Sequence, residues 1–145
     1  MVKRTRRRVC FVSEFVEGNF LGLPEGQGEP DVAILSVPYE LTSSYGQGSH
    51  EGPKATIDAS AQVELYDALL PEDLPSGFRI HTAEPWDGKG DTLQEQLSGI
   101  HRYIAKHLTA FPVVLGGEHG MLPAIMQAVG ETVNLSELTI VQIDA

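Results

Sequence analysis

Short apolar runs alternate along the chain with stretches in which apolar and polar residues recur at helical spacing. The runs at 31–37, 113–115 and 138–143 consist largely of β-branched and aliphatic residues and are predicted as strands, and Gly77–Thr82 is predicted as a further one. The run at 113–115 is typical of a strand that is buried on both faces, as in a parallel sheet. Pro38 follows the first run and ends it.

Three other stretches carry apolar residues at helical spacing and are predicted as helices. The first is Pro53–Leu70, which opens with a proline at a position where its missing N–H costs nothing. The second begins at an N-cap, Asp91, with Gln94 as its capping-box partner, and ends near Leu108. The third covers Met121–Val129. This order of strands and helices predicts an α/β protein with a parallel sheet and right-handed crossovers.

The length and composition are those of one ordinary domain with a core. The chain has 145 residues, of which 41% are hydrophobic, and no run is long enough to span a membrane. Glycine and proline punctuate the first 30 residues so densely that an irregular arm is predicted for residues 1–30. A single domain over residues 31–145 is expected to follow.

The charge is acidic and unevenly distributed. The formal net charge is −10, and five of the ten basic residues lie in the first eight positions. The rest of the chain therefore holds five basic and 20 acidic groups, a net charge of −15. Such a body attracts cationic small molecules and repels nucleic acid.

The basic start has three interpretations. It resembles the beginning of a secretion signal, but Glu14 and Glu17 interrupt the apolar segment that should follow, which excludes that interpretation. A nucleic-acid-binding arm and a solvated tail are the alternatives for residues 1–8, and the tail is favoured. Cys10 is the single cysteine, so an internal disulfide framework is excluded. A cytoplasmic protein fits these features.

The stretch Phe111–Gly120, FPVVLGGEHG, carries the first candidate chemistry. Its two glycines allow a sharp turn after the predicted strand, and Glu118 and His119 follow where the strand should hand over to a helix. The last predicted strand ends on Asp144. Because ligands bind beyond the carboxyl ends of parallel strands, an imidazole and a carboxylate are expected to converge there. The structural alternatives are a histidine bonded within a tight turn, and an aspartate that caps a helix or lies at a solvated strand end.

Other candidates are less specific. The loop Tyr39–Gly52 is either a functional loop or a plain surface connection, and its composition leaves both open. His81 is either a ligand or, more commonly, a structural residue. His101 and His107 are six residues apart, which does not place them on adjacent turns of one helix face. Two separate surface histidines are therefore favoured over a metal pair.

Three segments together carry a resemblance to a known family. They are Val37–Ser60 (VPYELTSSYGQGSHEGPKATIDAS) continued by Val63–Asp67 (VELYD), then Leu115–His119 (LGGEH), and finally Thr139–Ala145 (TIVQIDA). In this order they resemble the N-terminal half of a ureohydrolase of the agmatinase and arginase family, and agmatinases most closely. The resemblance covers about residues 31–145.

The resemblance implies a fold and a reaction. It implies a three-layer α/β/α sandwich around a parallel sheet and a site for two Mn²⁺ ions, with His119 and Asp144 as metal ligands. It implies that a metal-bound hydroxide attacks the guanidinium carbon of agmatine, releasing urea and putrescine, as in polyamine biosynthesis. A homo-oligomer is the expected state of the complete protein, without nucleic-acid or membrane partners.

Two departures from the family pattern change the expectation. Gly120 stands where the family usually has serine. The chain also ends at Ala145, before the His-x-Asp of the Asp-Ala-His-x-Asp motif, and the later Asp-x-Asp ligands are missing too. Two ligands are a poor site for a metal pair. The chain alone is therefore expected to bind Mn²⁺ weakly, to be inactive on agmatine, and to leave an exposed sheet edge.

Alternatives stay open at this point. Within the same class, an arginase, a guanidinobutyrase or a formiminoglutamase is compatible with the motifs. Outside it, the chain is a non-catalytic remnant or a module that binds an intact ureohydrolase subunit. A basic arm that binds nucleic acid is the third hypothesis.

Overall fold

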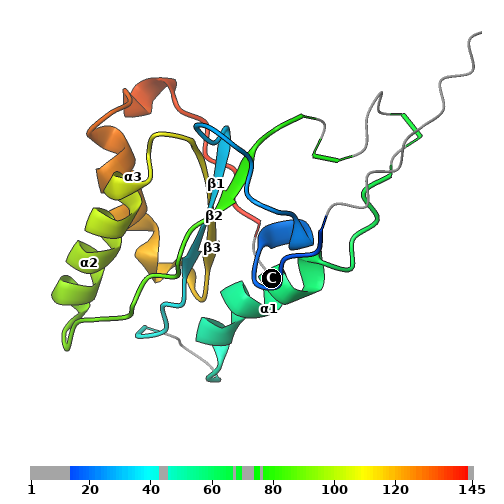
Figure 1. Ribbon diagram of the computed structural model, residues 1–145. Coiled ribbons are helices and arrows are strands. Elements are labelled where there is room, and N and C mark those ends of the chain that lie inside the picture. Colours follow the sequence, from blue (N-terminus) through cyan, green and yellow to red (C-terminus); the bar gives the residue numbers. More distant parts are fainter. Residues whose placement is uncertain (1–13, 43–45, 67, 70–73, 76, 144–145) are drawn as a thin grey trace, which may run out of the picture.

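A computed structural model describes residues 14–42, 46–66, 68–69, 74–75 and 77–143. Its centre is a parallel sheet of three strands in the order β2–β1–β3 (Figure 1). The strands are β1 (Val32–Val37), β2 (Ile80–Thr82) and β3 (Phe111–Gly116). The helices are α1 (Gly52–Ser60), α2 (Leu93–Lys106) and α3 (Leu122–Gly130).

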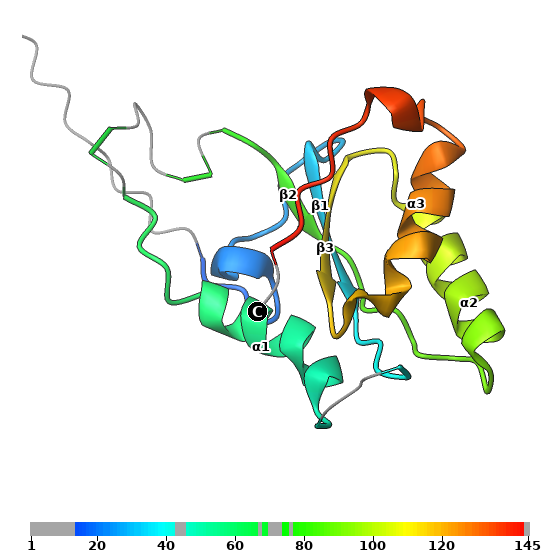
Figure 2. The same cartoon turned by 180° about the vertical axis from the view of Figure 1, so that it is seen from behind.

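The helices lie in two layers, one on each side of the sheet. Figures 1 and 2 show α2 and α3 together on one side, and α1 with the 3₁₀ helix η1 (Phe20–Gly22) on the other. The predicted α/β fold with a parallel sheet is therefore confirmed. Within the described ranges, no helix is long and apolar enough to cross a lipid bilayer.

Strand β1 is the centre of the core because both of its faces are covered. Alternate residues point to opposite faces of a strand. Ala33, Leu35 and Val37 belong to the core cluster on the side of α2, together with Ile100 and Ile104 of that helix, and all five are nearly fully buried. The pattern typical of a strand buried on both faces is thus seen in β1.

Strand β3 is less buried than its apolar sequence predicts. Val113–Leu115 are only half-buried, and Phe111 is 70% exposed. The reason is position, because β3 pairs with β1 on one side and has no partner on its other side among the described residues. Pro112, which has no N–H to donate, suits such an edge strand.

The order of the strands creates a switch point. The chain goes from β1 through α1 to β2 on one side, then returns through α2, on the opposite face, to β3 on the other side of β1. Because α1 follows β1 on one face and α3 follows β3 on the other, the outgoing connections of these two neighbouring strands diverge at their carboxyl ends. In open parallel sheets this is where a crevice forms and ligands bind.

The first helix is shorter than predicted. It was expected to run from Pro53 to Leu70, but α1 ends at Ser60, and Val63 bonds back to Ser60 in a turn. The apolar residues that suggested a continuation, Val63 and Tyr66, are 51% and 56% exposed. Helical spacing continues past Ser60 in the sequence, but side chains that stay about half exposed supply little of the tertiary packing that stabilises a helix.

The second helix begins one residue later than predicted. Its N-cap is Thr92, not Asp91, and the capping-box partner is Glu95, not Gln94. The Thr92 hydroxyl accepts a hydrogen bond from the Glu95 N–H at 3.3 Å, and the Glu95 carboxylate accepts one from the Thr92 N–H at 3.0 Å. Both neighbouring pairs fit the sequence rule, and the extended backbone of Thr92 decides between them.

The part of the predicted arm that the structure describes, residues 14–30, is packed against the domain. The Leu21 N–H donates to the Ser60 hydroxyl at 2.7 Å, and the Phe20 N–H donates to the Thr82 hydroxyl at 2.9 Å. The Thr82 N–H in turn donates to Glu25 at 3.0 Å. These contacts place the segment along the outer edge of β2.

The predicted last strand is wrong. Residues 138–143 form no strand, and Val141 and Ile143 are 82% and 96% exposed. They follow the 3₁₀ helix η4 (Leu135–Glu137), and no strand of the described chain pairs with them. An apolar run becomes a strand only where a neighbour supplies hydrogen-bond partners.

Candidate functional site

The turn after β3 lies directly against the loop after β1. A Cβ atom on Gly117 would lie 2.3 Å from the backbone oxygen of Tyr39 and 2.9 Å from that of Ser49. Neither Gly116 nor Gly117 has a positive φ. Glycine is therefore needed at 117 for the close approach of two backbones, and not for the sharp turn that the sequence suggested.

Glu118 joins the same two segments through its side chain. Its Oε1 atom accepts a hydrogen bond from the Thr42 N–H at 2.9 Å and another from the Thr42 hydroxyl. Its Oε2 atom is buried and has no hydrogen-bond partner among the described residues. One carboxylate oxygen thus holds the loop, and the other is an acceptor with a buried, unused lone pair.

His119 begins the 3₁₀ helix η3 (His119–Met121), directly after that carboxylate. Its side chain is exposed at the carboxyl end of β3, beside the switch point of the sheet. The second predicted ligand, Asp144, lies outside the described residues, so its convergence with His119 stays a prediction. Within the described part of the chain, no three His, Cys, Asp or Glu side chains come close enough to hold a metal ion.

Gly120 has a neighbour that explains its small size. A Cβ atom there would lie 2.6 Å from the Thr42 hydroxyl oxygen and 3.1 Å from Glu118 Oε1. The space that a serine side chain needs is thus occupied by the contact between Thr42 and Glu118. The position does not cap the following helix, since the residue before α3 is Met121.

A second ionisable pair organises the loop after β1, and the sequence did not single it out. The Glu40 carboxylate accepts from the backbone N–H groups of Gly48 and His50 at 2.9 and 3.0 Å, and its Oε2 atom lies 2.6 Å from His50 Nδ1. The side-chain and backbone hydrogen bonds from His50 lower the pKa of Glu40 to about 2. The same carboxylate raises the pKa of His50.

The pair joins Glu40, just after β1, to Gly48 and His50, just before α1. A weak signal was present in the sequence, because Glu40 and His50 bracket a polar, glycine-rich stretch directly after a strand. Nothing in that stretch specified that the two side chains face each other.

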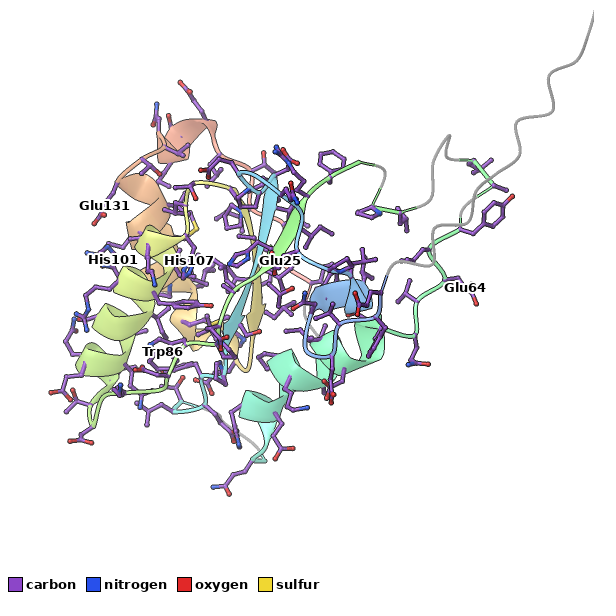
Figure 3. All side chains as sticks on the ribbon, in the orientation of Figure 1. Glu25, Glu64, Trp86, His101, His107 and Glu131 are labelled. Atoms are coloured by element: carbon purple, nitrogen blue, oxygen red, sulfur yellow. The ribbon has the colours of Figure 1, made fainter. Side chains whose placement is uncertain are left out.

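The other histidines are held separately. His81 Nδ1 lies 2.9 Å from Glu25, and His101 Nε2 lies 2.8 Å from Glu131 at the end of α3. His107 Nδ1 lies 2.8 Å from the backbone oxygen of Tyr103, within α2. Figure 3 shows His101 and His107 along α2, with Glu131 near the former. Each of these rings serves a local structural contact.

Comparison with known proteins gives a consistent result. A family profile described as "Arginase family" matches residues 30–145. The N(1)-aminopropylagmatine ureohydrolase of Synechocystis sp. is 32% identical over 122 residues, which are 79% of this chain and 39% of that protein. A protein of the same name from Thermus thermophilus is 34% identical over 119 residues, 81% of this chain and 40% of that protein. The agmatinase of Bacillus anthracis is 31% identical over 81% of this chain and 40% of its own length.

Solved structures share the fold at lower identity. A putative agmatinase from Clostridium difficile has a TM-score of 0.63 at 21% identity, covering 71% of this chain and 38% of its own. Proclavaminate amidino hydrolase from Streptomyces clavuligerus has a TM-score of 0.68 at 20% identity, covering 78% and 39%. The chain thus spans about two fifths of the length of the proteins it matches.

Proposed function

The chain belongs to the arginase family, and from this premise we propose that it is part of a ureohydrolase that acts on a linear guanidino-amine such as agmatine. In the proposed reaction water adds to the guanidino carbon and the bond from that carbon to the alkyl-bearing nitrogen breaks. The products are urea and the free amine. The acidic body of the chain favours a cationic substrate of this kind.

The observation that carries the proposal is the position of His119. It follows β3 at the switch point of the sheet, on a turn that two contacts hold to the loop after β1. One is the backbone approach at Gly117, and the other is the pair of hydrogen bonds from Thr42 to Glu118. An exposed imidazole on so constrained a turn is suited to hold a ligand in a defined place.

The donor atoms suit the metal that the family implies. An imidazole from His119 and a carboxylate from Asp144 are nitrogen and oxygen ligands of the type that Mn²⁺ accepts. When bound, the metal supplies a water whose pKa is low enough to yield a nucleophile near neutral pH. This chain supplies the two metal ligands, and Glu118 positions the turn that carries His119.

The donor set of this chain is small. Among the described residues it consists of His119 alone, with Asp144 proposed as the second ligand. The relatives are more than twice as long. The resemblance to the family implies further His and Asp ligands after the position of Ala145. We therefore expect the 145-residue chain by itself to bind Mn²⁺ weakly and to release no urea from agmatine.

The test is a titration of the chain with Mn²⁺ in which electron paramagnetic resonance measures the free ion. We expect weak binding that is lost in His119→Ala and unchanged in the control His107→Ala, whose imidazole serves α2. Equal binding by His119→Ala and the unchanged chain would remove His119 from the site. Urea release above a no-protein blank would overturn the expected inactivity.

A second candidate follows from the exposed apolar end of the described chain. Ile140, Val141 and Ile143 are largely exposed, and the outer edge of β3 has no strand partner in the described ranges. Such surfaces favour association with another polypeptide. A module that binds an intact ureohydrolase subunit would co-purify with a full-length relative, and an Ile140→Lys/Val141→Lys variant would lose that association.

A further inference from the structure

A hollow opens where the loop after β1 meets the segment that follows β2. It has a volume of about 340 Å³, is open to solvent, and includes Glu40, Gln47, His50, Trp86 and Gln96 in its lining. Glu40 follows the carboxyl end of β1, and Trp86 continues the path of β2, since its N–H donates to the Ser36 oxygen at 2.9 Å. The hollow therefore opens at the same edge of the sheet as His119. Figure 3 shows Trp86 at this end of the molecule, between α2 and the sheet.

The lining presents groups that bind an alkylammonium ion. The side chain of Glu40 is 11% exposed, and of its two oxygens only Oε2 carries the contacts to His50. Among the described residues, Oε1 accepts from the Gly48 N–H, at 2.9 Å, and one such bond leaves it acceptor capacity. The Gln96 amide donates its N–H to the Gly90 oxygen at 3.0 Å, which leaves the amide oxygen as an acceptor.

Trp86 adds an aromatic ring that is held in place. It is 5% exposed, and its Nε1 atom would lie 3.2 Å from a Cβ atom at Gly99 of α2, so helix and indole are in close contact. Aromatic rings attract cations through their quadrupole, and tryptophan does so most strongly. Carboxylate, amide oxygen and indole together match an ammonium group on an apolar stem.

The hollow adjoins the His119 turn directly. The Cα atom of His50 would lie 3.1 Å from a Cβ atom on Gly117, two residues before His119. A linear molecule with one end at the turn can thus extend its other end over His50 toward Glu40.

We propose that the hollow formed by Glu40, Gln47, Trp86 and Gln96 is a subsite for the ammonium end of a linear guanidino-amine. The proposal rests on the proposed function for the position of the guanidino end. The binding of the amine end needs only residues of this chain and no metal ion.

Trp86 is the single tryptophan of the chain, so its fluorescence and its indole N–H signal report on this hollow alone. The purified 145-residue chain is titrated in EDTA with three molecules that share a four-carbon stem. Agmatine carries a guanidino and an ammonium group, putrescine carries two ammonium groups, and butylguanidine carries no ammonium. We expect saturable changes with agmatine and putrescine and a response at least about tenfold weaker with butylguanidine.

Variants assign the response to the carboxylate. Glu40→Gln removes the negative charge and is expected to raise the dissociation constant of agmatine about tenfold. Glu64→Gln is the matched control, because this exposed residue lies on the other side of the sheet from Trp86, beyond α1 (Figure 3). If circular dichroism shows that Glu40→Gln does not fold, Gln47→Leu replaces it, with an expected loss of about threefold.

Three results would overturn the proposal: no change at Trp86 with either amine, equal binding of butylguanidine and agmatine, or unchanged agmatine binding in a folded Glu40→Gln variant. If putrescine binds as tightly as agmatine, the result supports a subsite that recognises only the ammonium group. Because the titration contains no metal, its failure leaves Mn²⁺ binding at His119 untouched, and the reverse also holds.

Discussion

The carboxylate of Glu118 accepts hydrogen bonds from both the backbone N–H and the hydroxyl of Thr42, across 76 residues of sequence. This contact joins the turn that carries His119 to the loop that follows the central strand. It also fills the space beside Gly120 that a larger residue would need. His119, the candidate ligand, therefore lies on a turn that is hydrogen-bonded to the neighbouring loop.

The first prediction concerns the energy of this contact. Thr42→Val removes the hydroxyl, and Glu118→Ala removes the acceptor of both bonds. We expect Glu118→Ala to cost about 1–2 kcal/mol of stability and Thr42→Val about 1 kcal/mol, since the contact is partly exposed to solvent. Urea denaturation of the two single variants and the double variant should give a coupling energy of about 1 kcal/mol. Additive effects would show that the two side chains stabilise the fold independently.

The second prediction concerns the close approach at Gly117. An added Cβ atom would meet the Tyr39 backbone oxygen at 2.3 Å, and backbone atoms cannot rotate away as a side chain does. We expect Gly117→Ala to destabilise the chain by about 2–3 kcal/mol. The substitution should also displace the turn that carries His119, so we expect the variant to bind Mn²⁺ more weakly than the unchanged chain.

Gly52→Ala is the matched control for this substitution. Gly52 is the first residue of α1 with φ of −52°, and its nearest contact for a Cβ atom is the Gly116 oxygen at an ordinary 3.7 Å. The free energy of unfolding of this variant should stay the same or rise by up to about 0.5–1 kcal/mol, because alanine has a higher helix propensity than glycine. Similar losses in both variants would contradict the role of the close approach.

The third prediction tests the capping box of α2. Thr92→Ala removes the hydroxyl that accepts from the Glu95 N–H and should cost about 1 kcal/mol. Thr56→Ala, on the exposed face of α1, should stay within about 0.5 kcal/mol of the unchanged chain. Thermal unfolding followed by circular dichroism distinguishes the two. A loss in Asp91→Ala larger than in Thr92→Ala would instead support the cap position that the sequence first suggested.

Much of the fold could be predicted because its signals are local. Strands β1 and β3 and helix α2 each show the periodicity of their own type in the sequence. In the structure each packs against neighbouring elements and forms as predicted. The end of α1 could not be predicted, because Val63 and Tyr66 continue the helical spacing in the sequence although both are about half exposed in the structure. Residues 138–143 have the composition of a strand, but pairing is a property of two segments and not of one.

The candidate site divides in the same way. His119 could be proposed because it follows an apolar run and two glycines, which is a pattern of adjacent residues. The contact of Glu118 with Thr42 and that of Glu40 with His50 could not, since each depends on how loops fold back on the sheet. Even the reason for Gly117 differs, because the backbone that it approaches lies far away in the sequence.

The last prediction concerns the pH dependence of the loop held by Glu40 and His50. The pKa of Glu40 is lowered from 4.5 to about 2, so its contribution to stability is present above pH 4.5 and is lost as the pH falls toward 2. The pKa of His50 is raised above its ordinary 6.5, so its contribution is full below pH 6.5 and is lost as the pH rises through the raised value. Together the pair should stabilise the loop most between about pH 4.5 and 6.5.

His50→Gln isolates this effect, because it keeps the backbone N–H that donates to Glu40 and removes the ionisable ring. We expect the difference in urea midpoint between this variant and the unchanged chain to be largest between about pH 4.5 and 6.5 and to shrink at higher pH, as neutral His50 loses its attraction to Glu40. His101→Gln serves as the control, because its ring contacts Glu131 and not the loop. A pH-independent difference for His50→Gln would mean that the ring acts through packing alone, and the Glu40 carboxylate would then hold the loop by its backbone contacts.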